Sequence, residues 1–245
     1  MKGGSFLRNS RLLMWVPIGI NLVFILVLSV LFIKLGGAGN NSNIIGKSEH
    51  LFNENPLYIE RTSLFQKLEI PSQSIVFLGD SLTDRVEWAE FFPDKRIINR
   101  GVGGDTTEGV LNRLDGIIKS KPEKVFIMIG INDLTIGIKM SETIKHYEEI
   151  LRTLNEKSPE TKVYVQSVLP ISPDINDDKI STEDIQELNK KLQMVVRNHE
   201  AEYIDLYNKF SVDGQLDKKL TVDGLHLKGE GYHMWKEAIE SYMAN

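Results

Sequence analysis

Two widely separated segments of the sequence carry the side chains that an activated serine needs. Ser81 comes after Gly79 and Asp80 at the end of an apolar run, and Asp223 precedes His226 by three residues near the other end of the chain. A serine hydroxyl becomes a nucleophile when a neighbouring base accepts its proton and a further group orients that base. The spacing allows the Asp223 carboxylate to reach the His226 ring. The two segments can therefore supply nucleophile, base and orienting group.

Two further segments carry groups that can stabilise a negatively charged oxygen. Residues 103–105, Gly-Gly-Asp, and residues 130–133, Gly-Ile-Asn-Asp, each follow a predicted strand. Hydrolysis of an ester develops an oxyanion, which preorganised hydrogen-bond donors stabilise. The backbone N–H groups of Ser81 and Gly104 and the side-chain amide of Asn132 are donors of this kind. These three residues are the predicted oxyanion hole.

Each of these residues also has a purely structural explanation. Asp80 or Ser81 can cap a helix, glycine and asparagine are common in turns, and a lone histidine usually has no catalytic role. The other histidines are assigned no function: His50, His146, His199 and His233. Four separate segments that each contribute a suitable group favour the catalytic interpretation, since independent accidents would have to coincide.

Strands and helices alternate along most of the chain. The predicted strands are residues 75–78, 96–99, 125–129, 163–168 and 202–205. The predicted helices are residues 56–68, 106–119, 144–154, 181–196 and 229–242, and Ser181 with Asp184 forms a capping box at the start of one of them. This alternation is typical of a parallel sheet covered by helices on both faces. Because open α/β sheets bind ligands at the carboxyl ends of their strands, we expect the segments around Ser81, Gly104 and Asn132 to converge there.

Composition narrows the classes of function. The chain has 245 residues, no cysteine and a formal net charge of −5, with +4 carried by residues 1–44 and −9 by the remainder. An acidic main domain argues against a nucleic-acid partner, and the missing thiols exclude disulfides, thiolate zinc sites and a cysteine nucleophile. The segment Gly101-x-Gly103-x-x-Thr106 is a poor dinucleotide-binding loop because it follows the second strand and ends in threonine. No metal or cofactor is predicted.

The amino-terminal region predicts a membrane anchor. Residues 12–33 carry no charge, and a helix of this length spans about 33 Å, enough to cross a hydrocarbon core of about 30 Å. Lys2, Arg8 and Arg11 precede this segment and only Lys34 follows closely, so we expect the amino end in the cytoplasm. A cleaved secretory signal is the alternative. The predicted single-pass protein of the cell membrane has a cytoplasmic segment 1–11, a transmembrane anchor 12–33, a linker 34–44 and an extracytoplasmic catalytic domain 45–245.

The four segments, in this order, resemble the SGNH hydrolases of the GDSL esterase family, and are most similar to its platelet-activating-factor acetylhydrolase-like branch. The resemblance covers residues 56–243 and rests on four blocks: Gly-Asp-Ser-Leu around Ser81, Asn-Arg-Gly-Val-Gly-Gly-Asp-Thr-Thr around Gly104, Gly-Ile-Asn-Asp around Asn132, and Asp-Gly-Leu-His at 223–226. It implies a three-layer, flavodoxin-like α/β fold and ester hydrolysis without a metal. It also implies that Ser81 is the nucleophile and first oxyanion donor, Gly104 and Asn132 are further donors, and Asp223 with His226 is the base pair.

These observations predict a serine esterase that removes small acyl groups, acetyl above all, through an acyl-Ser81 intermediate. The expected orientation of the domain makes acetylated glycans or lipids of the cell envelope candidate substrates. Two alternatives stay open. One is an O-acyltransferase that passes the same acyl group to a sugar hydroxyl, and the other is a non-catalytic surface binding module that keeps the fold.

Overall fold

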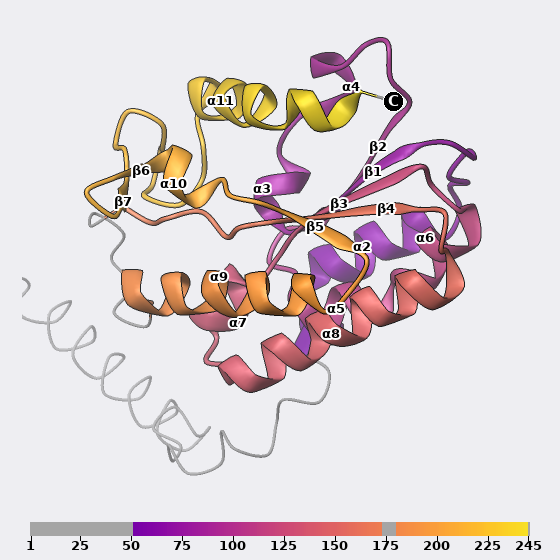
Figure 1. The fold of residues 1–245 in the computed structure, drawn as a ribbon, viewed down its shortest axis with the longest axis horizontal. Helices are drawn as coiled ribbons and strands as arrows, with labels where there is room; N and C mark the ends of the chain where they lie inside the picture. Colours follow the sequence, from indigo (N-terminus) through magenta and orange to yellow (C-terminus); the bar gives the residue numbers. More distant parts are fainter. Residues whose placement is uncertain (1–50, 173–179, 245) are drawn as a thin grey trace, which may run out of the picture. The chain divides into compact units, whose positions relative to one another are not determined.

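A sheet of five strands lies at the centre of the fold, in the order β2-β1-β3-β4-β5 (Figure 1). The computed structural model describes residues 51–172 and 180–244. The strands are β1 (Ile75–Gly79), β2 (Ile97–Gly101), β3 (Lys124–Met128), β4 (Lys162–Gln166) and β5 (Ala201–Ile204). Every neighbouring pair in this sheet runs parallel. The predicted α/β class and central parallel sheet are confirmed.

Helices cover both faces of the sheet, because successive side chains of a strand point to opposite sides. On one side, Val76 and Leu78 of β1 join a core formed with α5 (Thr107–Asn112), α6 (Leu114–Ser120), α8 (Met140–Lys157) and α9 (Thr182–Arg197). On the other side, Ile75 and Phe77 join a core formed with α3 (Ser81–Asp84), α4 (Trp88–Phe91) and α11 (Gly229–Ile239). Helices, sheet and helices therefore form three layers.

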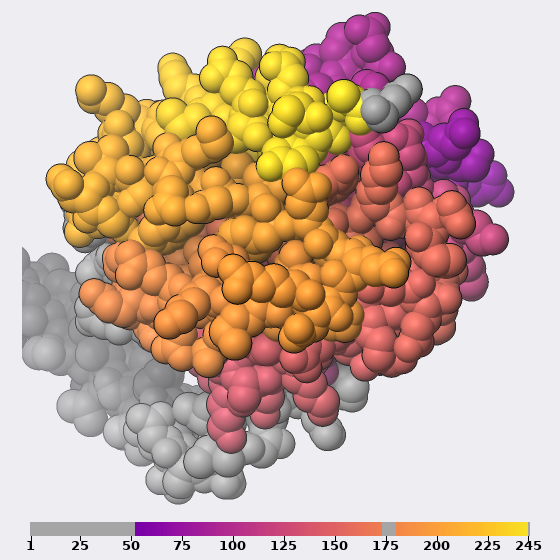
Figure 2. Space-filling model, viewed as in Figure 1, coloured from indigo at the N-terminus to yellow at the C-terminus, as the bar shows by residue number. Residues whose placement is uncertain are grey.

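Aromatic side chains join the two helices of the second layer. Figure 2 shows α11, in yellow, beside the magenta segment that carries α4. The rings of Trp88 and Trp235 meet edge to face with their centroids 5.1 Å apart, and Phe91 contacts His233 in the same way at 5.2 Å. His233, for which the sequence predicts no function, thus packs at this helix contact.

The remaining elements are short. They are a 3₁₀ turn (Leu51–Glu54), α2 (Pro56–Phe65), α7 (Ile131–Thr135), α10 (Tyr207–Phe210), the two-stranded hairpin β6 (Ser211–Val212) and β7 (Gln215–Leu216), and a last 3₁₀ turn (Glu240–Met243). The capping box predicted at Ser181 and Asp184 is present at the start of α9.

One predicted helix is two helices in the structure. The apolar stripe predicts a single helix over residues 106–119, but α5 and α6 are separated at Arg113, whose backbone angles are φ −108° and ψ 11°. The Arg113 guanidinium donates to the Asp105 carboxylate and to the carbonyl oxygens of Gly79 and Arg100. Apolar residues keep helical spacing on both sides of the break, so the periodicity does not reveal it.

The predicted membrane anchor lies outside the described residues. In the two stretches 51–172 and 180–244, every helix is too short or too polar to cross a bilayer. The predicted cytoplasmic segment, anchor and linker, residues 1–44, stay predictions.

Candidate active site

Ser81 is the first residue of α3, directly beyond the carboxyl end of β1. Asp80 caps this short helix, because its Oδ1 accepts a hydrogen bond from the Leu82 N–H at 3.0 Å. There is no room for a side chain at Gly79, where a Cβ would lie 2.3 Å from the Met128 carbonyl oxygen. Ser81 follows this crowded strand end by two residues, and only 9% of the residue is exposed.

The structure brings Ser81, His226 and Asp223 together. Ser81 Oγ lies 2.9 Å from His226 Nε2, although the residues are 145 positions apart in the sequence. His226 Nδ1 lies 2.6 Å from Asp223 Oδ2. A ring that donates from Nδ1 to a carboxylate has Nε2 free to accept the serine proton. The arrangement can therefore raise the nucleophilicity of Ser81.

Asp223 is held as a carboxylate by its hydrogen bonds. Burial would raise the pKa of Asp223, but hydrogen bonds from the His226 ring and from the N–H groups of His226 and Leu225 outweigh it and lower the pKa to about 2. At neutral pH the charge on Asp223 stabilises the imidazolium that forms when His226 accepts a proton.

The turn formed by residues 221–226 positions His226 next to Ser81. Thr221 Oγ1 donates to the His226 carbonyl oxygen at 2.8 Å and accepts from the Gly224 N–H at 2.9 Å. Gly224 has φ +92°, a conformation that favours glycine, and its carbonyl oxygen accepts from the Ser172 N–H at 2.8 Å. Hydrogen bonds within the turn and to Ser172 order this segment, for which the sequence predicts no helix or strand.

Two of the three predicted oxyanion donors, Gly104 and Asn132, belong to segments that are hydrogen-bonded to each other. Gly104 has φ +72°, in the left-handed region, and no hydrogen bond among residues 51–172 and 180–244 uses its N–H. Asn132, in the first turn of α7, donates from Nδ2 to the Asp105 carbonyl oxygen at 2.8 Å, which leaves the second hydrogen of its amide available. The loop of Gly104 and the side chain of Asn132 therefore hold fixed positions relative to each other.

Asn55 holds the glycine loop from the other side, a contact that the sequence analysis missed. Its Oδ1 accepts from the Leu57 N–H at 3.0 Å as the cap of α2, while its Nδ2 donates to the Gly103 carbonyl oxygen at 3.0 Å. A Cβ at Gly104 would lie 3.1 Å from the same Nδ2. The Asn-Pro pair at the start of α2 predicts a helix cap, but nothing in the sequence connects that cap to a loop 48 residues further on.

We expect Asn55→Asp to lower kcat about tenfold with little change in KM. Aspartate can still cap α2 through an oxygen, but it cannot donate to the Gly103 carbonyl oxygen, so the Gly104 N–H would lose its fixed direction. Steady-state kinetics on p-nitrophenyl acetate, with melting temperatures, measure this. Asn55→Ala removes both bonds and should lower kcat and the melting temperature together. A kcat of Asn55→Asp equal to that of the unchanged protein would show that the bond to Gly103 is dispensable.

Three carboxyl groups are buried beneath the site. Asp105 pairs with Arg113, with an oxygen–nitrogen distance of 2.7 Å. Asp133 accepts hydrogen bonds from the backbone N–H and the hydroxyl of Thr107. Asp80, fully buried, uses Oδ1 for its helix cap, and its Oδ2 has no hydrogen-bond partner among the described residues. Within the described stretches of the chain, Asp105 is the one of the three that forms an ion pair.

Burial shifts these carboxyl groups toward the neutral form. Desolvation, followed by the charges of Asp105 and Asp133, raises the pKa of Asp80 to about 7 against hydrogen bonds that lower it. Desolvation likewise raises the pKa of Asp133 to about 6. The Thr107 hydroxyl that bonds Asp133 also lies 3.0 Å from Nδ1 of His146, a histidine for which the sequence predicts no role.

We expect Asp80→Asn to remove part of the fall in stability between pH 5 and pH 7. The pKa of Asp80 is higher in the folded chain than its ordinary value of 3.8, so the folded state binds more protons and becomes less stable as the pH rises toward 7. For one group the slope approaches roughly 1 kcal/mol per pH unit. Asparagine keeps the oxygen that caps α3 and cannot ionise.

Urea unfolding at several pH values measures the effect of Asp80→Asn. The free energy of unfolding of the variant, relative to the unchanged protein, should rise from pH 5 to pH 7. Asp94→Asn, at an exposed position, is the control and should show no such rise. Parallel pH curves for Asp80→Asn and the unchanged protein would contradict the expectation.

In residues 51–172 and 180–244, no group of three or more histidine and carboxylate side chains is placed to hold a metal ion.

The chain is similar to known acylhydrolases. It matches the model of the GDSL-like Lipase/Acylhydrolase family over residues 77–234. The human platelet-activating factor acetylhydrolase IB subunit alpha1 is 28% identical over 181 residues, which covers 69% of this chain and 74% of the relative. A solved structure from Streptococcus pneumonia aligns with a TM-score of 0.69 at 26% identity, over 77% of this chain and 91% of that one. The lipase/acylhydrolase from Enterococcus faecalis aligns with a TM-score of 0.61 at 26% identity, over 71% of this chain and 95% of that one. The family match includes every residue of the site above except Asn55.

Proposed function

Because this chain belongs to the GDSL-like lipase/acylhydrolase family, we propose that Ser81 is the nucleophile with which it hydrolyses esters of small acyl groups, acetyl first among them. The family and the relatives named acetylhydrolase identify it as a carboxylic ester hydrolase. One observation carries the assignment of the nucleophile: Ser81 Oγ lies 2.9 Å from His226 Nε2, and His226 Nδ1 lies 2.6 Å from Asp223 Oδ2.

The reaction begins with proton transfer. His226 Nε2 accepts the Ser81 proton while Oγ bonds to the carbonyl carbon of the ester. The carbonyl oxygen becomes an oxyanion, which the N–H groups of Ser81 and Gly104 and the Asn132 amide stabilise. When the tetrahedral intermediate collapses, the alcohol leaves with the proton from His226 and the acyl group stays on Ser81. Water then attacks the acyl-serine by the same steps and releases the carboxylic acid.

The acetyl preference is supported by the relatives whose names specify acetylhydrolase. A series of p-nitrophenyl esters tests it on the purified chain. We expect kcat/KM to be highest for the acetate and to fall through the butyrate to the octanoate. Ser81→Ala protein gives the background for each ester. An octanoate rate above the acetate rate would overturn the preference for small acyl groups and leave the nucleophile assignment intact.

We further propose that the catalytic domain lies outside the cytoplasm and acts on acetylated glycans or lipids of the cell envelope. The support is the uncharged segment 12–33 and the excess of basic residues before it. Protease treatment of intact cells tests the orientation. Digestion of the domain is expected, whereas protection until the cells are lysed would contradict it. Release of acetate from isolated envelope fractions by the unchanged protein, and not by Ser81→Ala, tests the substrate class.

A further inference from the structure

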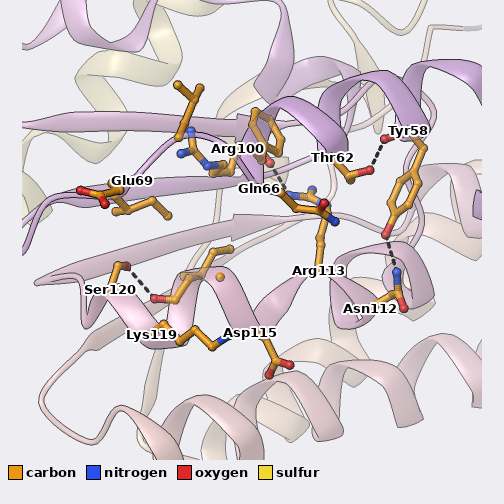
Figure 3. Close-up of a pocket in the computed structure, with 15 residues that line it drawn as sticks. Tyr58, Thr62, Gln66, Glu69, Arg100, Asn112, Arg113, Asp115, Lys119 and Ser120 are labelled. Atoms are coloured by element: carbon orange, nitrogen blue, oxygen red, sulfur yellow. Dashed lines mark hydrogen bonds between the residues drawn. The ribbon is translucent and has the colours of Figure 1, made fainter.

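A cavity lies beside the edge strand β2, between α2 and the pair α5 and α6 (Figure 3). Its volume is about 600 Å³. Its lining includes neither Ser81 nor His226. The ester hydrolysis proposed above does not involve this cavity.

Arg100 lines this cavity and is only 7% exposed. Its guanidinium lies 4.5 Å from the centre of the Phe65 ring, and its Nη1 donates to the Asn99 carbonyl oxygen at 3.0 Å. No carboxylate within residues 51–172 and 180–244 forms an ion pair with it. A buried charge is costly unless an opposite charge accompanies it.

The neighbouring cations already have partners. Arg61 pairs with Asp84 at 3.0 Å, and Arg113 pairs with Asp105 at 2.7 Å. Burial, and then the charges of Arg113 and Arg61, lower the pKa of Arg100 to about 10. Of these three arginines, Arg100 is the one for which the described residues provide no carboxylate partner.

Two donor atoms of Arg100, in the lining of the cavity, are left for a ligand. Within the described parts of the chain, Nε and Nη2 of Arg100 have no hydrogen-bond acceptor. Both atoms remain accessible to solvent. A guanidinium binds a carboxylate through two parallel hydrogen bonds. Phe65, Leu68 and Ile117 supply apolar walls beside it. Figure 3 shows Glu69, Asp115 and Lys119 as the other charged side chains of this lining, and its two carboxylates disfavour a ligand with several negative charges.

We propose that this cavity binds a small monocarboxylate with a short aliphatic chain, its carboxylate on Arg100 and its chain against the three apolar walls. One carboxylate suits the one buried arginine of the cluster that has no carboxylate partner among the described residues. The inference goes beyond the proposed esterase function and does not depend on it.

Calorimetric titration of the full chain with hexanoate tests the proposal, with 1-hexanol as the neutral probe of the same length. We expect hexanoate to bind at least about tenfold more tightly than hexanol, because the charge on Arg100 acts only on the carboxylate. Arg100→Gln should abolish that difference. Ser81→Ala protein should bind hexanoate as the unchanged protein does, because Ser81 is not part of the cavity. Equal affinity for hexanol and hexanoate, or no binding at about 20 mM, would overturn the proposal.

A larger side chain at position 116 would fill the cavity and leave Arg100 unchanged. Gly116 lies in α6 and lines the cavity, and a Cβ built there meets nothing within 4 Å. Gly116→Leu therefore has room for its side chain and improves the helix propensity of that position. It should remove hexanoate binding while the melting temperature is maintained. Gly229→Leu, at an equally open helical position in α11, is the control. Hexanoate binding that survives Gly116→Leu would place the ligand elsewhere and refute the site.

Discussion

Replacing Ser81 by alanine is expected to lower kcat for p-nitrophenyl acetate on the order of 10⁴-fold or more. The substitution removes only the oxygen that would attack the ester and that contacts His226 Nε2 at 2.9 Å. The oxyanion donors stay in place, so a small residual rate is expected rather than none. Steady-state kinetics measure the loss. A labelled fluorophosphonate provides a second readout, since it should modify the unchanged protein and leave Ser81→Ala unlabelled.

Ser63→Ala is the matched control for this loss. Ser63 lies on α2, where its hydroxyl donates to the Glu60 carbonyl oxygen at 2.7 Å, and it is exposed. It should keep full activity and full labelling. Both variants should unfold cooperatively near the melting temperature of the unchanged protein, because each loses a single side-chain oxygen. Undiminished turnover by Ser81→Ala would remove Ser81 from the reaction.

Asp223→Asn is expected to lower kcat on the order of 10³ to 10⁴-fold while KM changes little. The amide of asparagine can donate toward His226 Nδ1, which would favour the tautomer with its hydrogen on Nε2. That nitrogen could then no longer accept the Ser81 proton. The geometry of the turn should persist, because the amide oxygen can still accept from the N–H groups of Leu225 and His226, as Asp223 Oδ1 does.

Asp217→Asn controls for the loss of a carboxylate in a turn. Asp217 Oδ1 accepts from the Lys219 N–H at 2.9 Å, just as Asp223 Oδ1 accepts from the Leu225 N–H, and Asp217 lies outside the site. Its kcat should equal that of the unchanged protein. If Asp223→Asn kept kcat within about threefold of the unchanged protein, the carboxylate would have no part in orienting His226.

The strands could be predicted from the sequence because burial on both faces leaves a local signature. β1 and β3 are buried at every position, and the apolar runs predicted them within two residues of their bounds. The break at Arg113 could not be predicted, since it coincides with the contacts that its guanidinium makes with Gly79, Arg100 and Asp105. Those partners lie outside the predicted helix, so the spacing of its apolar residues does not indicate these contacts.

The blocks around Ser81, Asn132 and His226 identified candidate side chains, but not the distances between them. Nor did the sequence indicate that Asn55 would bond the glycine loop or that Asp80 would be fully buried. It likewise did not indicate that Arg100 would line a cavity with no ion-pair partner among the described residues. Each of these features depends on which segments become neighbours.

The sequence by itself determined the residue types available for chemistry and the alternation that makes a parallel sheet. The tertiary structure alone decided that a hydroxyl and an imidazole 145 residues apart lie 2.9 Å from each other. It also decided the environment that shifts the pKa of Asp80, and it left Arg100 with no ion-pair partner in the described parts of the chain. The physical reason is that strand and helix patterns arise from local periodicity, whereas hydrogen-bond distances and desolvation depend on atoms from segments remote in the chain.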